Sequence, residues 1–195
     1  MLRPPRLGLF GGSFDPIHSG HLGLARAAVA QAGLDQIMFL PARRSPHKAQ
    51  GPIASDAQRL AMLHLAVTGF PEAVVSDFEL QAPPPSYSWE TALHFQDLRK
   101  GAQLYWLLGL DQWNALDRWR HPERLAETVE FLVFARDGQE MASHPYPHQR
   151  LTGTFPFSST QIREALAQGD PAPPDSLPPA VKDFIEKQQL YRQRL

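Results

Sequence analysis

The stretch of this 195-residue sequence with the clearest chemical potential is residues 11–21, GGSFDPIHSGH. The adjacent Gly11 and Gly12 let the backbone turn sharply and approach a ligand closely. His18 and His21 follow at the start of an alanine- and leucine-rich stretch, so both imidazoles project from the same side of a helix start. A helix N-terminus adds free N–H groups and partial positive charge. The stretch therefore predicts a binding site for phosphate oxygens.

Other interpretations of this pair of histidines are weaker. An isolated HxxH pair is usually a coincidence, and zinc would need a third ligand that the neighbouring sequence does not offer. Helical zinc pairs also more often use a spacing of four residues. Neither GxxxxGK[ST] nor GxGxxG occurs, which excludes a P-loop and an ordinary dinucleotide fingerprint.

Apolar runs that alternate with amphipathic stretches must position this site. Strands are expected at residues 7–10, 37–40, 74–75, 104–108 and 131–134. Helices are expected at residues 21–32, after a Ser55–Gln58 capping box, and at 89–100, 111–117, 122–127, 159–168 and 180–191. Residues 82–88, 137–150 and 170–179 are polar or proline-rich and are expected to be surface loops. Unbroken apolar strands separated by helices indicate an α/β fold, a doubly wound parallel sheet with a small helical C-terminal addition.

Composition narrows the class of protein. Hydrophobic residues make up 43% of the chain, enough for a core, and the net charge of −1 argues against charge-driven binding to nucleic acid or membrane. The lack of cysteine excludes disulfides, thiolate catalysis and cysteine-ligated metals. No apolar run is long enough to span a bilayer, and glycines and Asp15 interrupt any signal-peptide core, so a cytoplasmic protein is expected.

The 11–21 string in its strand–loop–helix setting resembles the GTFDPxHxGH-like loop of the nucleotidylyltransferase superfamily. Its branch that makes dinucleotide cofactors, the nicotinate-mononucleotide adenylyltransferases, is the nearest match, with Ser13 in place of threonine. The resemblance implies a single domain over residues 1–195, with a Rossmann-like core over about 1–150 and a helical part over about 151–195. It implies ATP and nicotinate mononucleotide as substrates, and Mg²⁺ held by substrate phosphates with no metal ligand from protein side chains.

Four further segments resemble the same family in the same order, so the likeness extends from about residue 7 to 191. They are SPHK at 45–48, SYS at 86–88, GLD at 109–111 with Trp119 and Arg120, and SSTQIR at 158–163. Residues 81–85 depart from the family, because its usual arginine and glycine are replaced by QAPPP. The serine–threonine cluster of the last segment caps a helix in most proteins, yet its hydroxyls and free N–H groups also suit phosphates.

Roles for individual residues follow from the resemblance. The residues it implies at ATP are Gly11, Gly12, Ser13, Phe14, His18, His21, Arg136, Ser158, Ser159, Thr160, Ile162 and Arg163. Those implied at the nicotinate nucleotide are Ser13, Lys48, Ser88, Gly109, Asp111, Trp119 and Arg120. Those implied in catalysis are His18, His21, Lys48 and Arg163. Trp119 could stack on a pyridine ring, whereas Trp106 and Trp113 are expected to be packing residues.

The expected reaction is attack by a phosphate oxygen of the acceptor on the α-phosphorus of ATP. A phosphomonoester has a second pKa near ~6, so no side-chain nucleophile or general base is required. Nicotinamide mononucleotide and phosphopantetheine remain alternative acceptors. A ligase resembling the aminoacyl-tRNA synthetases is disfavoured by length, charge and the lack of KMSKS. A non-catalytic ATP-binding module is the alternative outside the enzymes, and a homo-oligomer formed through the last helix stays open.

Overall fold

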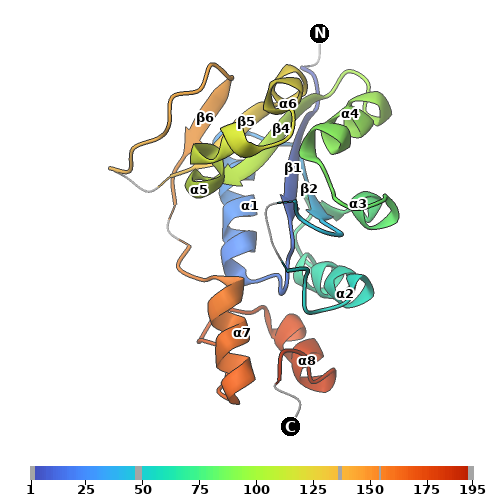
Figure 1. Ribbon diagram of the computed structural model, residues 1–195, viewed down its shortest axis with the longest axis vertical. Helices are drawn as coiled ribbons and strands as arrows, with labels where there is room; N and C mark the ends of the chain where they lie inside the picture. Colours follow the sequence, from blue (N-terminus) through green and yellow to red (C-terminus); the bar gives the residue numbers. More distant parts are fainter. Residues whose placement is uncertain (1–2, 47–49, 136–137, 154, 193–195) are drawn as a thin grey trace.

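The computed structural model describes residues 3–46, 50–135, 138–153 and 155–192, and its centre is a parallel sheet (Figure 1). The strands are β1 (Arg6–Gly12), β2 (Gln36–Pro41), β3 (Ala73–Val75), β4 (Gln103–Gly109), β5 (Glu130–Phe134) and β6 (His148–Leu151). They lie in the order β3-β2-β1-β4-β5-β6, and every neighbouring pair is parallel. Because the order reverses between β1 and β4, the expected doubly wound, Rossmann-like sheet is confirmed.

The helices follow the strands along the chain. They are α1 (Ser19–Ala32), α2 (Asp56–Ala66), α3 (Phe78–Gln81), α4 (Ser88–Leu98), α5 (Leu110–Asn114), α6 (Pro122–Thr128), α7 (Ser159–Gln168) and α8 (Pro179–Lys187), with a 3₁₀ turn at Leu116–Arg118. The capping box of Ser55 and Gln58 begins α2 as predicted, and Gly33 ends α1 with φ of 60°. No helix within the described ranges is long and apolar enough to cross a bilayer.

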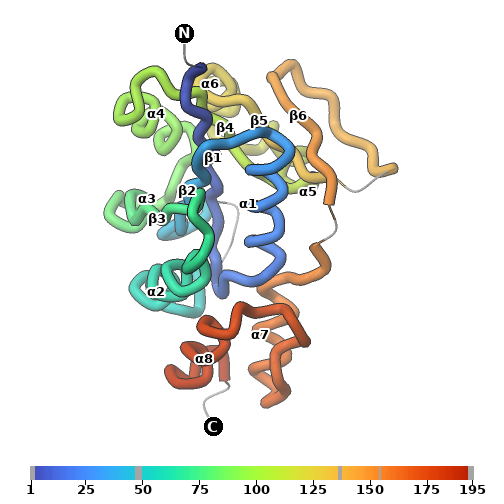
Figure 2. The backbone as a smooth tube through the Cα atoms, turned by 180° about the vertical axis from the view of Figure 1, so that it is seen from behind, coloured from blue at the N-terminus to red at the C-terminus, as the bar shows by residue number. Residues whose placement is uncertain are grey.

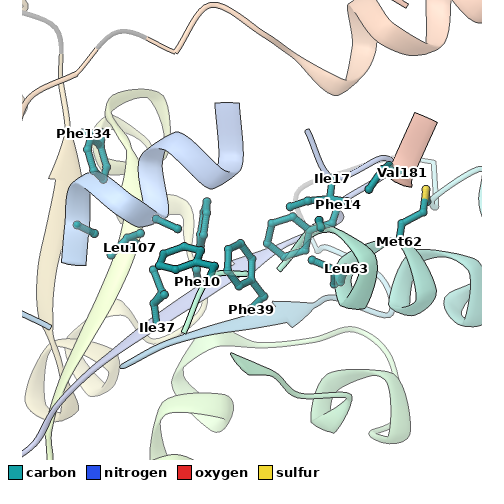
Figure 3. Packing of buried hydrophobic residues seen from close by; sticks show 14 of the residues in the cluster. Phe10, Phe14, Ile17, Ile37, Phe39, Met62, Leu63, Leu107, Phe134 and Val181 are labelled. Carbon is teal, nitrogen blue, oxygen red and sulfur yellow. The ribbon is translucent and has the colours of Figure 1, made fainter. Parts of the chain in front are cut away.

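Alternating side chains divide the interior into two cores, one on each face of the sheet. Phe10 pairs with Phe39 on β2, and both point into the core that α1, α2, α7 and α8 cover (Figure 3). Leu9 pairs with Met38 and Trp106, and these three point into the opposite core beneath α4, α5 and α6. Both faces are therefore buried, as a parallel sheet requires. In both views α7 and α8 lie at the end opposite the N-terminus (Figure 2).

Two local predictions were wrong. Residues 148–150 were expected to be loop, yet they belong to the edge strand β6, whose first three side chains are polar and therefore carry no apolar signal. The last helix was expected to reach residue 191, but α8 ends at Lys187. Gln189 and Tyr191 there adopt φ of 50° and 65°, a left-handed turn that breaks the helix and brings the Tyr191 ring into the interior. The short helix α3 had no expectation attached to it.

Candidate active site

A cavity of about 350 Å³ opens at the carboxyl ends of β1 and β4. Gly11 and Gly12, which end β1, and Gly109, which ends β4, line it. The strand order reverses between these two strands, and this crevice is where doubly wound sheets bind ligands. Two groups of segments line the cavity. The first group consists of the start of α1 and the start of α7, and the second consists of the start of α4 together with Trp119 and Arg120. The helices α4 and α7 lie far apart in both views (Figures 1 and 2).

The two histidines form a reciprocal cap at the start of α1. The backbone N–H of His21 donates to Nδ1 of His18, and that of His18 donates to Nδ1 of His21, each at 3.3 Å. The rings stack with their centroids 3.7 Å apart. Because Nδ1 is the acceptor in both rings, Nε2 carries the proton of each neutral imidazole. His21 lines the cavity, where its Nε2–H is the predicted donor to a phosphate.

His18 lies deeper than His21. Its side chain is buried, and burial lowers its pKa to about 4, so the imidazole is neutral at physiological pH. A Cβ atom at position 20 would lie 2.9 Å from this ring, which explains the glycine there. Among the described residues that line the cavity His21 is present and His18 is absent, so a phosphate contact from His18 stays a prediction.

Asp15 joins residues 11–21, the phosphate loop of the sequence prediction, to the C-terminal part of the chain. Its buried carboxylate accepts hydrogen bonds from the N–H groups of Ile53 (2.8 Å) and Ala54 (3.0 Å) and from the hydroxyl of Tyr191 (2.8 Å). Its carbonyl oxygen accepts a hydrogen bond from Arg163 at 2.7 Å. Arg163 and Asp15 both line the cavity, so this network sets where the guanidinium lies.

A buried arginine supports the same loop from α2. Arg59 is fully buried, and its guanidinium donates to the carbonyl oxygen of Ser13 at 2.7 Å. It also forms an ion pair with Asp56 at 2.6 Å. A buried guanidinium needs hydrogen-bond partners, so Arg59 links α2 to the Ser13 backbone.

At the start of α7, Ser158 accepts a hydrogen bond from the N–H of Gln161 at 3.2 Å and so acts as a helix cap. The neighbouring Ser159 lines the cavity, and its hydroxyl donates to the carbonyl oxygen of Pro16 at 3.0 Å. The predicted Ile162 is fully buried in the core. The SSTQIR segment therefore combines a helix cap with two residues, Ser159 and Arg163, at the cavity.

The second group of lining residues includes Ser86, Tyr87 and Ser88. The Arg120 guanidinium lies over the Tyr87 ring, 5.4 Å from its centroid, and both Trp119 and Arg120 line the cavity. Glu79 also lines it, with a side chain that is only 4% exposed. Burial raises the pKa of this carboxyl group.

The two remaining tryptophans named in the sequence analysis pack in the sheet core as expected. Trp113 is fully buried and donates through Nε1 to the carbonyl oxygen of Ala142 at 2.8 Å. Trp106 is also buried, and one edge of it reaches the cavity beneath Gly11.

Most residues predicted for the site come together in the structure. Those that line the cavity are Gly11, Gly12, Ser13, Phe14, His21, Ser88, Gly109, Trp119, Arg120, Ser159 and Arg163. Those described but outside the lining are His18, Asp111, Ser158, Thr160 and Ile162. Lys48 and Arg136 lie outside the described residues. Sequence reasoning did not identify Asp15, Arg59, Glu79 and Tyr191, which are buried and form hydrogen bonds next to the cavity. Within the described part, no group of three or more His, Cys, Asp or Glu side chains could hold a metal ion.

Known proteins resemble this chain over nearly its whole length. A family model described as cytidylyltransferase-like matches residues 9–165. A Methylacidiphilum infernorum protein named probable nicotinate-nucleotide adenylyltransferase is 41% identical, over 95% of this chain and 92% of that protein. A Thermus thermophilus protein of the same name is 39% identical, over 96% of this chain and 100% of that protein. The solved structure of Plasmodium falciparum nicotinic acid mononucleotide adenylyltransferase, complexed with NaAD, has a TM-score of 0.77 at 18% identity, over 96% of this chain and 97% of that one. This likeness shows a shared fold.

Proposed function

The chain belongs to the nicotinate-nucleotide adenylyltransferase family of cytidylyltransferase-like proteins, and from this premise we propose that it transfers AMP from ATP to nicotinate mononucleotide. The products are nicotinate adenine dinucleotide and pyrophosphate. The observation that supports this most is the composition of the cavity at the ends of β1 and β4, whose lining includes both the phosphate loop and the Ser86–Ser88, Trp119 and Arg120 group.

The reaction exchanges one bond to phosphorus for another. A phosphate oxygen of the acceptor bonds to the α-phosphorus of ATP, while the bond from that phosphorus to the bridging oxygen of the β-phosphate breaks. The electron pair leaves with pyrophosphate. Since the acceptor phosphate is mostly ionised near about pH 7, the protein needs to supply alignment and charge neutralisation rather than a nucleophile.

We assign the ATP phosphates to the loop and to α7. His21 presents Nε2–H to the cavity from the positive end of a helix, which suits charge that develops at the α-phosphate. Arg163 is held by the Asp15 carbonyl and faces the same space, so it is suited to the departing pyrophosphate. The family resemblance implies a catalytic role for Lys48 at the ATP phosphates and an auxiliary role for Arg136 near the nucleotide, and we retain both assignments.

We assign the nicotinate end to the other group of lining residues. Ser88 is the first residue of α4, so its N–H group and hydroxyl can both donate to a carboxylate. Trp119 offers a flat apolar face to the pyridine ring, and Arg120 adds positive charge beside it. A carboxylate needs several donors, and Ser88 and Arg120 provide them in this group.

Mg²⁺ enters this scheme as part of the ATP substrate. The carboxyl groups among the described cavity-lining residues are Asp15 and Glu79, and both accept hydrogen bonds from the protein. We therefore infer that substrate phosphates and water would supply its ligands, and that its chemistry is neutralisation of phosphate charge.

The experiment that tests the function measures pyrophosphate release with ATP and Mg²⁺ in the presence of nicotinate mononucleotide, nicotinamide mononucleotide or phosphopantetheine. We expect a clear preference for nicotinate mononucleotide. His21→Ala serves as the inactive reference, with turnover lower by about a factor of 10² or more, because it removes a donor to the transition state while α1 keeps its fold.

Each other outcome has a definite meaning. Preference for another acceptor would retain the ATP site and overturn the nicotinate assignment. If no pyrophosphate is released with any of the three acceptors although ATP binds measurably, a non-catalytic ATP-binding module is favoured. Near-normal turnover of His21→Ala would remove His21 from the mechanism.

A further inference from the structure

Glu79 is a buried acidic residue at the cavity for which the reaction has no direct use. It lies in the four-residue helix α3, lines the cavity, and is only 4% exposed. Its Oε1 accepts a hydrogen bond from the hydroxyl of Thr91 at 2.8 Å, and Ser86 is its second side-chain partner. A carboxyl group is costly to bury, so a buried one that keeps neutral hydroxyl partners indicates a specific local task.

The partners of Glu79 extend to the neighbouring segments. The Ser86 hydroxyl oxygen accepts a hydrogen bond from the N–H of Arg43 at 3.2 Å, and the Ser86 N–H donates to the carbonyl oxygen of Arg44 at 3.1 Å. The Thr91 hydroxyl also approaches the carbonyl oxygen of Tyr87 at 3.3 Å. Four segments therefore meet around Glu79: the end of β2, α3, the proline-rich connection and the first turn of α4.

Before Ser86, the connection between α3 and α4 has few hydrogen bonds within the described residues. Residues 83–85 are prolines, which have no N–H groups to donate. The Arg43 side chain donates to the Ala82 carbonyl oxygen at 3.3 Å, but this contact is exposed. The buried hydrogen bond from Thr91 to Glu79, together with the contact between Ser86 and Glu79, is thus placed to fix the far end of the connection, where residues 86–88 reach the cavity.

We propose that Glu79 is a positioning residue for the acceptor nucleotide. It holds Ser86 and Thr91, and through them it fixes Tyr87 and Ser88 in the cavity wall, so that the Ser88 donors are in place before the acceptor arrives. The assignment of this wall to the acceptor rests on the proposed function. Direct contact is disfavoured, since a carboxylate facing an acceptor that carries a phosphate and a carboxylate would repel it.

The test compares four variants in two measurements. Glu79→Ala removes both hydrogen bonds, Glu79→Gln keeps an acceptor for Thr91, and Thr91→Val removes one donor at nearly constant volume. Glu90→Gln is the matched control, because Glu90 is an exposed carboxylate one residue from Thr91. Hydrogen exchange of peptides covering residues 82–90 reports on the wall without substrate, and steady-state kinetics give separate KM values for ATP and the acceptor.

We expect Glu79→Ala to speed exchange in residues 86–90 and to raise the acceptor KM about tenfold, with the ATP KM within about twofold of wild type. Glu79→Gln should recover most of both effects, Thr91→Val should show part of them, and Glu90→Gln should match wild type. A general structural role predicts instead that both KM values and the melting temperature change together, and that result would overturn the proposal.

The proposal and the function on which it rests fail in different ways. If the wild-type protein does not react with any of the three acceptors, the proposed function fails. Hydrogen exchange then still decides whether Glu79 fixes residues 86–88. If wild type is active but Glu79→Ala leaves both the exchange and the acceptor KM unchanged, the function stands and the positioning role of Glu79 is wrong.

Discussion

The two histidines of the phosphate loop show how one residue type acquires two roles through burial. His18 and His21 exchange equivalent hydrogen bonds at 3.3 Å, yet His18 is only 5% exposed and His21 lines the cavity. The buried ring is suited to capping α1 and to holding its neighbour, because a neutral imidazole is the form that burial favours. The ring at the cavity carries the Nε2–H that we propose as a donor to the ATP phosphates.

His18 gives the fold a dependence on pH that can be measured. In the unfolded chain it titrates near its ordinary value of 6.5, while the folded protein lowers the pKa to about 4. Below pH 6.5 the unfolded state therefore binds the extra proton, so stability that is complete above pH 6.5 is lost as the pH falls towards 4. His18→Asn keeps a capping side chain but does not titrate in this range. Between about pH 7 and about pH 4.5, we expect its free energy of unfolding to fall by about 2 to 3 kcal/mol less than that of wild type.

Urea unfolding at the two pH values measures this difference. Carboxylates throughout the chain contribute to acid sensitivity in both proteins, so only the gap between wild type and His18→Asn is informative. Equal losses of unfolding free energy in the two proteins would show that His18 is not buried in its neutral form.

At the same scale, sequence reasoning identified residues with a recognisable spacing and missed residues whose role depends on burial. Gly11, His21 and Arg163 belong to motifs, and all three line the cavity. Arg59 and Glu79 carry no such signal, because a charged residue in an amphipathic stretch is normally on the solvent face. Their partners, Ser13 and Thr91, lie 46 and 12 residues away in sequence, so tertiary contact alone reveals them.

At the scale of elements, strands and helices with buried apolar runs were predictable and the edges of the fold were not. The central strands β1 and β4 were predictable because both of their faces are buried, which gives each strand an unbroken apolar run. The edge strand β6 pairs with β5 through its backbone, which leaves no apolar pattern to detect. The end of α8 was misjudged because Leu190 and Tyr191 continue the apolar spacing of the helix, although the backbone has already turned away.

That turn after α8 gives Tyr191 a specific task, the hydrogen bond from its hydroxyl to Asp15. Burial raises the pKa of Tyr191, so the hydroxyl stays protonated and able to donate. Tyr191→Phe leaves the buried carboxylate with one donor fewer, and we expect the free energy of unfolding to fall by about 1.5 to 3 kcal/mol. Chemical denaturation measures it.

Tyr146→Phe is the matched control for this change. The Tyr146 side chain contacts the rings of Phe131 and His144, so loss of its hydroxyl should change stability by no more than about 0.5 kcal/mol. If both tyrosine variants are equally stable, the hydrogen bond from Tyr191 to Asp15 contributes nothing to the free energy of unfolding. The turn after α8 then does not support the phosphate loop.

At the scale of the whole molecule, the C-terminal helices share a core with the sheet. Ile162 of α7 and Val181 and Ile185 of α8 belong to the same buried cluster as Phe10 and Phe39. Figure 3 shows Val181 together with these two phenylalanines. This continuity supports the prediction that residues 1–195 form one domain, in which residues 151–195 do not unfold by themselves.

The tryptophans offer a direct measurement of this cooperativity, because all four lie between residues 89 and 119, far along the chain from α8. Val181→Ala opens a cavity at a fully buried position of α8, and we expect it to cost about 2 kcal/mol. In a single cooperative unit, the free energy of unfolding followed by tryptophan fluorescence must fall by that whole amount, and the midpoint must shift with it. Asp183→Ala, an exposed change on the same helix, should leave the midpoint in place. A Val181→Ala protein whose helical circular dichroism is lost early, while its tryptophan transition stays at the wild-type midpoint, would instead establish residues 151–195 as a separately folding part.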